Sequence, residues 1–189
     1  KAAVRWLRAH ADEYGYDASR IGVAGTSAGG HLALLMGATN GVQKLEGDVG
    51  GNLDQSSSVQ AVVDYYGPSD FLLRSKNQPS KTEKSGSPVR LLLGGPASEM
   101  TDLARLASPA YHVTDNAPPL LIIHGDKDGT VRLDHSKRMV TEYNKHHRDV
   151  TLEVVAGAGH GGPAHFSPEY RQKVADFFTK HLRADVKRP

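Results

Sequence analysis

The apolar positions of the chain change repeatedly between helical spacing and strand-like runs. Val4, Leu7 and Ala11 recur at helical spacing and predict an amphipathic helix over residues 1–14. Runs rich in β-branched residues predict strands at residues 21–24, 59–66, 119–125 and 150–156. Further helices are predicted over residues 28–38, 134–146 and 168–182. Strands that alternate with helices indicate an α/β fold with a parallel sheet flanked by helices.

The middle of the chain has a weaker pattern. Residues 59–66 are largely apolar without strict alternation, which is typical of a parallel strand covered on both faces. Residues 74–88 are rich in Ser, Lys and Pro and show no periodicity, so we predict a mobile excursion there. Short helices are expected at 90–93 and 98–106. Residues 68–117 are thus interpreted as an excursion or cap-like segment of a single domain over residues 1–189.

Length, charge and composition exclude several classes of protein. A chain of 189 residues suits one domain with a substantial core. The net charge of +2 is too small to indicate a nucleic-acid partner, and the sequence has no apolar run long enough to span a membrane. The absence of cysteine excludes disulfides and thiolate chemistry but leaves the cellular location undetermined.

The first predicted strand leads into a glycine-rich turn followed directly by a helix. Gly25-Thr26-Ser27-Ala28-Gly29 matches the G-x-S-x-G pattern, and the strand–turn–helix context is that of a nucleophile elbow. In such a turn the serine has a strained backbone, and the flanking glycines let strand and helix approach closely. The helix that follows would direct backbone N–H groups at an oxyanion formed beside Ser27.

Two later loops supply the partners that a serine nucleophile needs. A hydroxyl needs an imidazole to accept its proton, and the imidazole needs a carboxylate to fix its tautomer. Asp128 and His160 each follow a predicted strand, and the chain order Ser, Asp, His is that of α/β-hydrolases. We therefore predict Ser27 as nucleophile, His160 as base and Asp128 as acid. Asp126 competes for the acid role but is better placed to cap its turn.

Other histidines receive lesser roles. His165 is the fallback base, His31 is interpreted as a packing residue, and His124 is interpreted as a hydrogen-bonded core residue. No two histidines lie at metal-ligand spacing beside a carboxylate, so no metal site and no cofactor are predicted.

These motifs resemble the α/β-hydrolase family, and within it bacterial esterases similar to feruloyl and acetyl-xylan esterases and to hormone-sensitive-lipase-like enzymes. The matching segments are residues 20–34, 66–71, 107–109, 118–128 and 157–162. The resemblance implies a serine carboxylester hydrolase acting through an acyl-enzyme on short acyl or aryl esters, with carbohydrate-linked esters included. It also implies that the N–H of Ala28 is one oxyanion donor.

The resemblance also defines departures and alternatives. Arg132 stands where the family usually has proline, and the family's His-Gly-Gly-Gly-type loop is not among these residues. We therefore expect the chain to be the C-terminal portion of the fold and part of a longer protein. It would leave residues 21–24 as an exposed edge, able to pair with a second copy. The alternatives are a serine peptidase of the prolyl-oligopeptidase type and a catalytically impaired fragment.

Overall fold

The secondary structure alternates between strands and helices, as the apolar pattern predicts. The computed structural model describes residues 1–183. The strands are β1 (Gly22–Thr26), β2 (Ala61–Tyr65), β3 (Leu120–Gly125) and β4 (Val150–Val155). The helices are α1 (Ala2–Ala9), α2 (Ala11–Tyr14), α3 (Ala28–Ala38), α4 (Phe71–Asn77), α5 (Pro88–Leu93), α6 (Thr101–Leu106), α7 (Asp134–Lys145) and α8 (Pro168–Leu182). Four single-turn 3₁₀ helices in this part of the chain are η1 (Gln43–Leu45), η2 (Pro79–Lys81), η3 (Pro109–Tyr111) and η4 (Pro163–Phe166). The predicted α/β class is confirmed.

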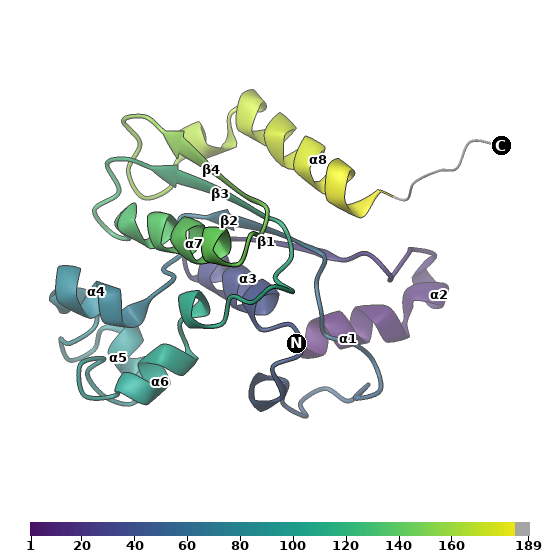
Figure 1. Ribbon diagram of the computed structural model, residues 1–189, viewed down its shortest axis with the longest axis horizontal. Helices are drawn as coiled ribbons and strands as arrows, with labels where there is room; N and C mark the ends of the chain where they lie inside the picture. Colours follow the sequence, from purple (N-terminus) through teal and green to yellow (C-terminus); the bar gives the residue numbers. More distant parts are fainter. Residues whose placement is uncertain (184–189) are drawn as a thin grey trace.

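Within residues 1–183 the strands form one parallel sheet in the order β1-β2-β3-β4. The register pairs Gly22 with Ala61, Val62 with Leu120, and Leu120 with Val150. Because all the strands run in the same direction, their carboxyl ends meet at one edge of the sheet. Figure 1 shows α4, α5 and α6 gathered beyond that edge.

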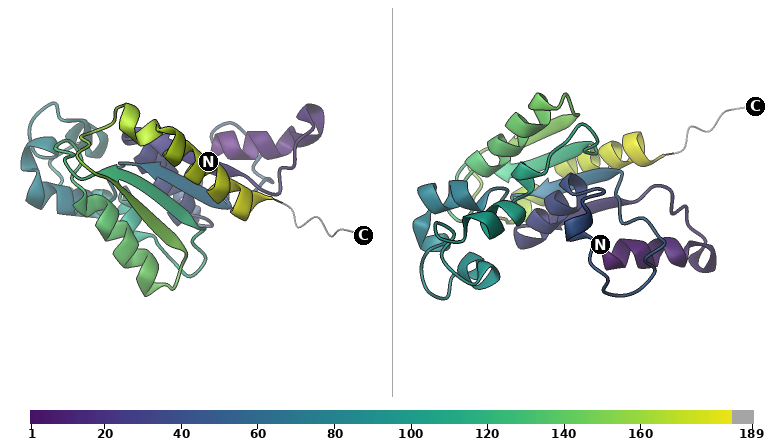
Figure 2. Two further views of the ribbon diagram at one scale, coloured as in Figure 1. Left: turned by 90° about the horizontal axis from the view of Figure 1, so that it is seen from above. Right: turned by 60° about the horizontal axis from the view of Figure 1, so that its bottom comes forward.

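Helices cover both faces of the sheet. Figures 1 and 2 show α3 and α7 on one face and α8 lying across the other. The strands β2 and β3 are buried at every position, which confirms the covered parallel strand predicted from the largely apolar residues 59–66. The sheet is therefore the middle layer of three.

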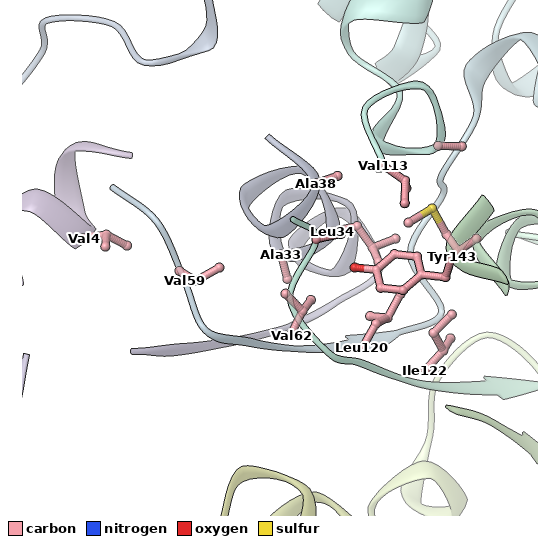
Figure 3. Close-up of a cluster of buried hydrophobic side chains, with 13 residues drawn as sticks. Val4, Ala33, Leu34, Ala38, Val59, Val62, Val113, Leu120, Ile122 and Tyr143 are labelled. Atoms are coloured by element: carbon pink, nitrogen blue, oxygen red, sulfur yellow. The ribbon is translucent and has the colours of Figure 1, made fainter. Parts of the chain in front are cut away.

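The main core lies between the sheet and the face that carries α3 and α7. Tyr143 of α7 is 1% exposed and packs in one cluster with Leu34 of α3 and Leu120 of β3. Figure 3 shows this ring between the two aliphatic side chains. A smaller cluster on the opposite face includes Ile123, and Phe178 of α8 packs against this cluster.

The N-terminal helix is shorter than predicted. The apolar spacing predicts one helix over residues 1–14, but α1 and α2 are separated at His10, where φ is −110° and ψ is 14°. The Nδ1 atom of His10 lies 2.8 Å from the carbonyl oxygen of Trp6, one helical turn earlier. That contact at the carbonyl coincides with the break in the helix.

The predicted mobile excursion at residues 74–88 is wrong for its first half. The helix α4 begins at Phe71, and the carboxylate of Asp70 caps it by accepting hydrogen bonds from the N–H groups of Leu72 and Leu73, each at 2.9 Å. Phe71 is buried with Val89 and other apolar residues in a separate cluster formed by α4, α5 and α6. Packing of this cluster orders a segment whose composition indicates a loop.

The strand β1 lies at an edge of the sheet, because its hydrogen-bonded neighbour in residues 1–183 is β2 alone. Pairing of this edge with a second copy of the chain stays a prediction. In the part of the chain that the structure describes, none of the helices has the length and apolar character needed to cross a bilayer.

Candidate active site

The turn between β1 and α3 has the geometry of a nucleophile elbow. Ser27 has φ 52° and ψ −116°, a left-handed conformation that is strained for a residue with a side chain. A Cβ on Gly25 would lie 2.1 Å from the carbonyl oxygen of Gly29, so only glycine fits there. Gly30 is the second position where only glycine fits, because an added Cβ would lie 2.2 Å from Oδ1 of Asp64. A Cβ added at Gly29 would meet nothing within 4 Å. The G-x-S-x-G pattern therefore identifies the first sterically required glycine, Gly25, correctly. It places the second at Gly29, one residue before the glycine that the structure requires.

The structure brings the three predicted side chains together at the carboxyl ends of β1, β3 and β4. The Oγ atom of Ser27 lies 2.8 Å from Nε2 of His160. Nδ1 of the same ring lies 2.7 Å from Oδ2 of Asp128. A neutral imidazole with its proton on Nδ1 would donate to the carboxylate and leave Nε2 free to accept the serine proton.

The carboxylate of Asp128 is held by several hydrogen-bond donors. Its Oδ1 accepts from the N–H groups of Thr130 and Val131 at 2.8 and 2.9 Å, and its Oδ2 also lies 3.2 Å from Nε2 of His124. Burial alone would raise the pKa of Asp128, but hydrogen bonds from His124, His160 and these two amides outweigh it and lower the pKa to about 2. Asp128 is therefore ionised at any pH where a neutral imidazole could act as a base.

His124 is a contact of the acid that sequence reasoning missed. The prediction of a hydrogen-bonded core histidine is confirmed, because the ring is fully buried and both nitrogens have partners. Nε2 lies 2.8 Å from the carbonyl of Val131 as well as near Asp128, so it carries the proton, and Nδ1, 2.6 Å from the hydroxyl of Ser136, accepts. The four-residue spacing from His124 to Asp128 across a strand end was the available sequence signal.

The alternative acid, Asp126, and the alternative base, His165, make no hydrogen bond to the other residues of the triad. The exposed Asp126 accepts from the N–H of Gly157 at 2.7 Å, which is the turn-capping role that the sequence favoured. His165 is fully buried, and neither of its ring nitrogens has a partner among residues 1–183. It is thus His160, not His165, that contacts Ser27.

Tyr66 is a second residue that the sequence did not reveal. It follows β2 directly with φ 48°, and its ring centroid lies 4.8 Å from those of both His160 and His165. Its hydroxyl is so close to Gly161 that a Cβ there would lie only 3.2 Å away. Tyr66 therefore supports the glycine-flanked loop that carries His160.

A cavity of about 260 Å³ adjoins Ser27. Ala28 lines it and is the first residue of α3, so the helix supplies no acceptor for its amide. His31 lines it too, with Nε2 2.7 Å from the carbonyl oxygen of Ala107, so this residue does more than pack. Burial lowers the pKa of His31, which favours a neutral ring. The remaining lining residues are Pro68, Phe71, Arg74, Pro88, Val89, Leu92, Thr130 and Val131.

Asp64 lies in β2 beneath the elbow and makes the stability of the fold depend on pH. It is fully buried, with Oδ1 accepting from the N–H of Gly67 at 2.8 Å and Oδ2 without a partner among residues 1–183. Burial raises the pKa of Asp64 to about 7 from the usual 3.8, although the Gly67 amide and the nearby His124 oppose this shift. The folded protein therefore keeps a proton that the unfolded chain loses between about pH 4 and pH 7, and stability falls as the pH rises through that window.

We expect Asp64→Asn to remove this loss of stability, because asparagine resembles the protonated acid. Urea unfolding of both proteins at pH 4, 6 and 8 should show the variant gaining relative stability as pH rises, by at most about 1.4 kcal/mol per pH unit. Asp126→Asn, at an exposed carboxylate, is the matched control. Stability curves for Asp64→Asn and the unchanged protein that run parallel from pH 4 to 8 would contradict this account of Asp64.

The fold and the site together define a class of protein. A parallel sheet with a strained serine after one strand, and an acid and a histidine in loops after two others, is the arrangement of the α/β-hydrolases. A family model described as BD-FAE matches residues 1–143, and the chain belongs to this family. The resemblance inferred from the sequence motifs is confirmed.

Individual relatives agree with this family. The chain is 34% identical over 162 residues to Esterase LipC of Mycobacterium tuberculosis, a match covering 85% of this chain and 39% of that esterase. A structure described as a truncated form of a carbohydrate esterase from gut microbiota is 34% identical, with a TM-score of 0.84, over 94% of this chain and 65% of that one. A bifunctional GH43-CE protein of Bacteroides eggerthii is 35% identical, with a TM-score of 0.85, over 94% of this chain and 24% of that one. The chain thus spans less than two thirds of the length of these relatives.

Proposed function

We propose that this chain carries the catalytic triad of a serine carboxylester hydrolase that works through an acyl-enzyme. The hydrogen-bonded line from Ser27 through His160 to Asp128 is the observation that carries the proposal. The relative named as an esterase supports ester substrates, and the structure described as a carbohydrate esterase supports carbohydrate-linked esters. The preference for short acyl or aryl groups is part of the proposal.

The reaction follows from the positions of these atoms. Oγ of Ser27 attacks the ester carbonyl carbon while its proton passes to Nε2 of His160, and the oxyanion that forms is received by the N–H of Ala28. The tetrahedral intermediate collapses as His160 gives the proton to the departing alcohol oxygen, which leaves an acyl group on Ser27. A water molecule then attacks that acyl group and gives its proton to His160. Return of the proton to Ser27 releases the carboxylic acid.

The amide of Ala28 is one oxyanion donor, and the family resemblance assigns further donors to a His-Gly-Gly-Gly-type loop that is not among these 189 residues. Removal of one such donor typically lowers turnover by about 10²–10³-fold. We therefore propose a modest rate for this chain by itself and a higher rate for a longer protein that includes that loop.

The test compares an ester with a peptide. The chain is assayed with 4-nitrophenyl acetate and with a prolyl peptide 4-nitroanilide, and labelling by an organophosphate is followed by intact mass. The proposal predicts ester hydrolysis, negligible anilide hydrolysis and one phosphoryl group attached at Ser27. Anilide hydrolysis exceeding ester hydrolysis would favour the peptidase alternative, and absence of both turnover and labelling would favour an impaired fragment.

A further inference from the structure

The pocket beside Ser27 is lined by a buried cation that has no ion-pair partner among residues 1–183. Arg74 of α4 lines this pocket and is 8% exposed. One terminal nitrogen, Nη2, donates to the carbonyl of Thr130 at 2.8 Å, whereas Nε has no hydrogen-bond partner in the described chain. No carboxylate of residues 1–183 forms an ion pair with Arg74.

The acids near this pocket are already engaged. Asp128 accepts from His160, His124 and two backbone amides. Asp70 caps α4 and lies 3.3 Å from Nε of Arg138. The charge of Asp128 favours the protonated guanidinium of Arg74 from a distance, but no carboxylate of residues 1–183 contacts it, and a buried ion without a contacting partner is costly.

Besides the ionised Asp128, the titratable groups that act on Arg74 are two neutral histidines. Burial and the charge of Arg74 both lower the pKa of His31, which lines the same pocket. Burial lowers the pKa of His135 to about 4, and Arg74 contributes to the lowering. Burial lowers the pKa of Arg74 as well, but a guanidinium stays protonated in proteins. Arg74 is thus the cation of this pocket.

We propose that this pocket binds a carboxylate carried by the ester substrate, with Arg74 as its counterion. A guanidinium presents paired N–H donors that match the two oxygens of a carboxylate. Phe71, Val89 and Leu92 give the pocket apolar walls for the short carbon chain or ring between that carboxylate and the ester bond. The substrates would then be half-esters of dicarboxylic acids or esters of hydroxyaryl carboxylic acids. This inference rests on the proposed esterase function and narrows it.

The experiment uses two pairs of esters that differ in one charge. Mono-4-nitrophenyl glutarate is compared with its methyl ester, and 4-acetoxybenzoate with methyl 4-acetoxybenzoate, so the charge lies on the acyl part in one pair and on the alcohol part in the other. We expect kcat/KM to be roughly ten- to a hundred-fold higher for the anionic member of at least one pair. Arg74→Gln should abolish that preference, and Arg74→Lys should keep part of it. Arg132→Gln, at an exposed cation, is the control and should leave the preference unchanged.

Two results would overturn the inference. One is the absence of any preference for the anionic ester in both pairs. The other is an equal loss of activity on anionic and neutral esters in Arg74→Gln and Arg74→Lys, which would mean that Arg74 only supports the Thr130 loop.

A binding measurement separates this inference from the proposed function. Calorimetry with Ser27→Ala should show the anionic ester of at least one pair binding at least about tenfold more tightly than its neutral partner, and adding Arg74→Gln should remove the difference. This result would stand even if the unchanged protein hydrolysed neither ester. Equal affinities in Ser27→Ala would refute carboxylate binding even if esters are hydrolysed.

Discussion

Replacing Ser27 with alanine is expected to lower kcat for 4-nitrophenyl acetate by roughly 10⁴- to 10⁶-fold or to the rate of the buffer. The hydroxyl of Ser27 supplies the bond that the acyl-enzyme needs, and its proton has an acceptor 2.8 Å away in Nε2 of His160. Without that hydroxyl, the pocket and the Ala28 amide can only position water. Stopped assays that follow the chromogenic product over hours can measure the low rates that this loss of kcat would leave.

Ser85→Ala is the matched control, since this serine is exposed and lies outside the cavity beside Ser27. Circular dichroism and thermal unfolding of Ser27→Ala should resemble those of the unchanged protein, because Ser27 Oγ has His160 as its partner rather than a core group. A Ser27→Ala variant that folds and retains more than about a tenth of the activity would refute the assignment of the nucleophile.

The second large effect is expected for Asp128→Asn, which should lower kcat by about 10⁴-fold while the protein stays folded. The asparagine oxygen can still accept from the amides of Thr130 and Val131. Its NH₂ group then faces His160 and donates to Nδ1, which moves the imidazole proton to Nε2. In that tautomer the ring can no longer accept the proton of Ser27.

Asp126→Asn provides the comparison for Asp128→Asn, because it removes a carboxylate two residues away that accepts from Gly157 instead. We expect it to change kcat by less than about threefold, as is usual for exposed positions outside the site. Similar losses of kcat in both variants would mean that the charge of the loop, rather than the contact between Asp128 and His160, determines the rate.

The unchanged protein should also lose the stabilisation from ionised Asp128 as pH falls from about 4 to 2, since the pKa of this group is lowered to about 2 in the folded state.

The sequence was most informative where chemistry is confined to a strand end. Ser27, Asp128 and His160 each follow a predicted strand closely, and parallel strands bring such positions to one edge of the sheet. The arrangement of these three side chains could therefore be predicted without coordinates. Their catalytic roles stay predictions until the variants above are measured.

Sequence reasoning failed where distant segments determine the local structure. The second half of α4 lies in the Ser-, Lys- and Pro-rich stretch that begins at residue 74, and the helix is stabilised by the Asp70 cap and by the buried cluster around Phe71. The cap was visible in the sequence, but the cluster was not. Because Arg74 lies on this helix, its position in the pocket beside Ser27 was hidden as well. Tyr66 was missed for a related reason, since its role depends on contact with the His160 loop far along the chain. His124 was missed although its contact with Asp128 is local.

The order of the strands in the sheet follows the order of the chain, so the polypeptide can add each strand beside the one before it. Ser27 and His160 are nevertheless 133 residues apart. The base can reach the nucleophile only after β4, the last strand among residues 1–183, has docked. Reactivity of the serine toward an organophosphate should therefore appear late in refolding, after most of the helix signal has recovered, and would report completion of the sheet.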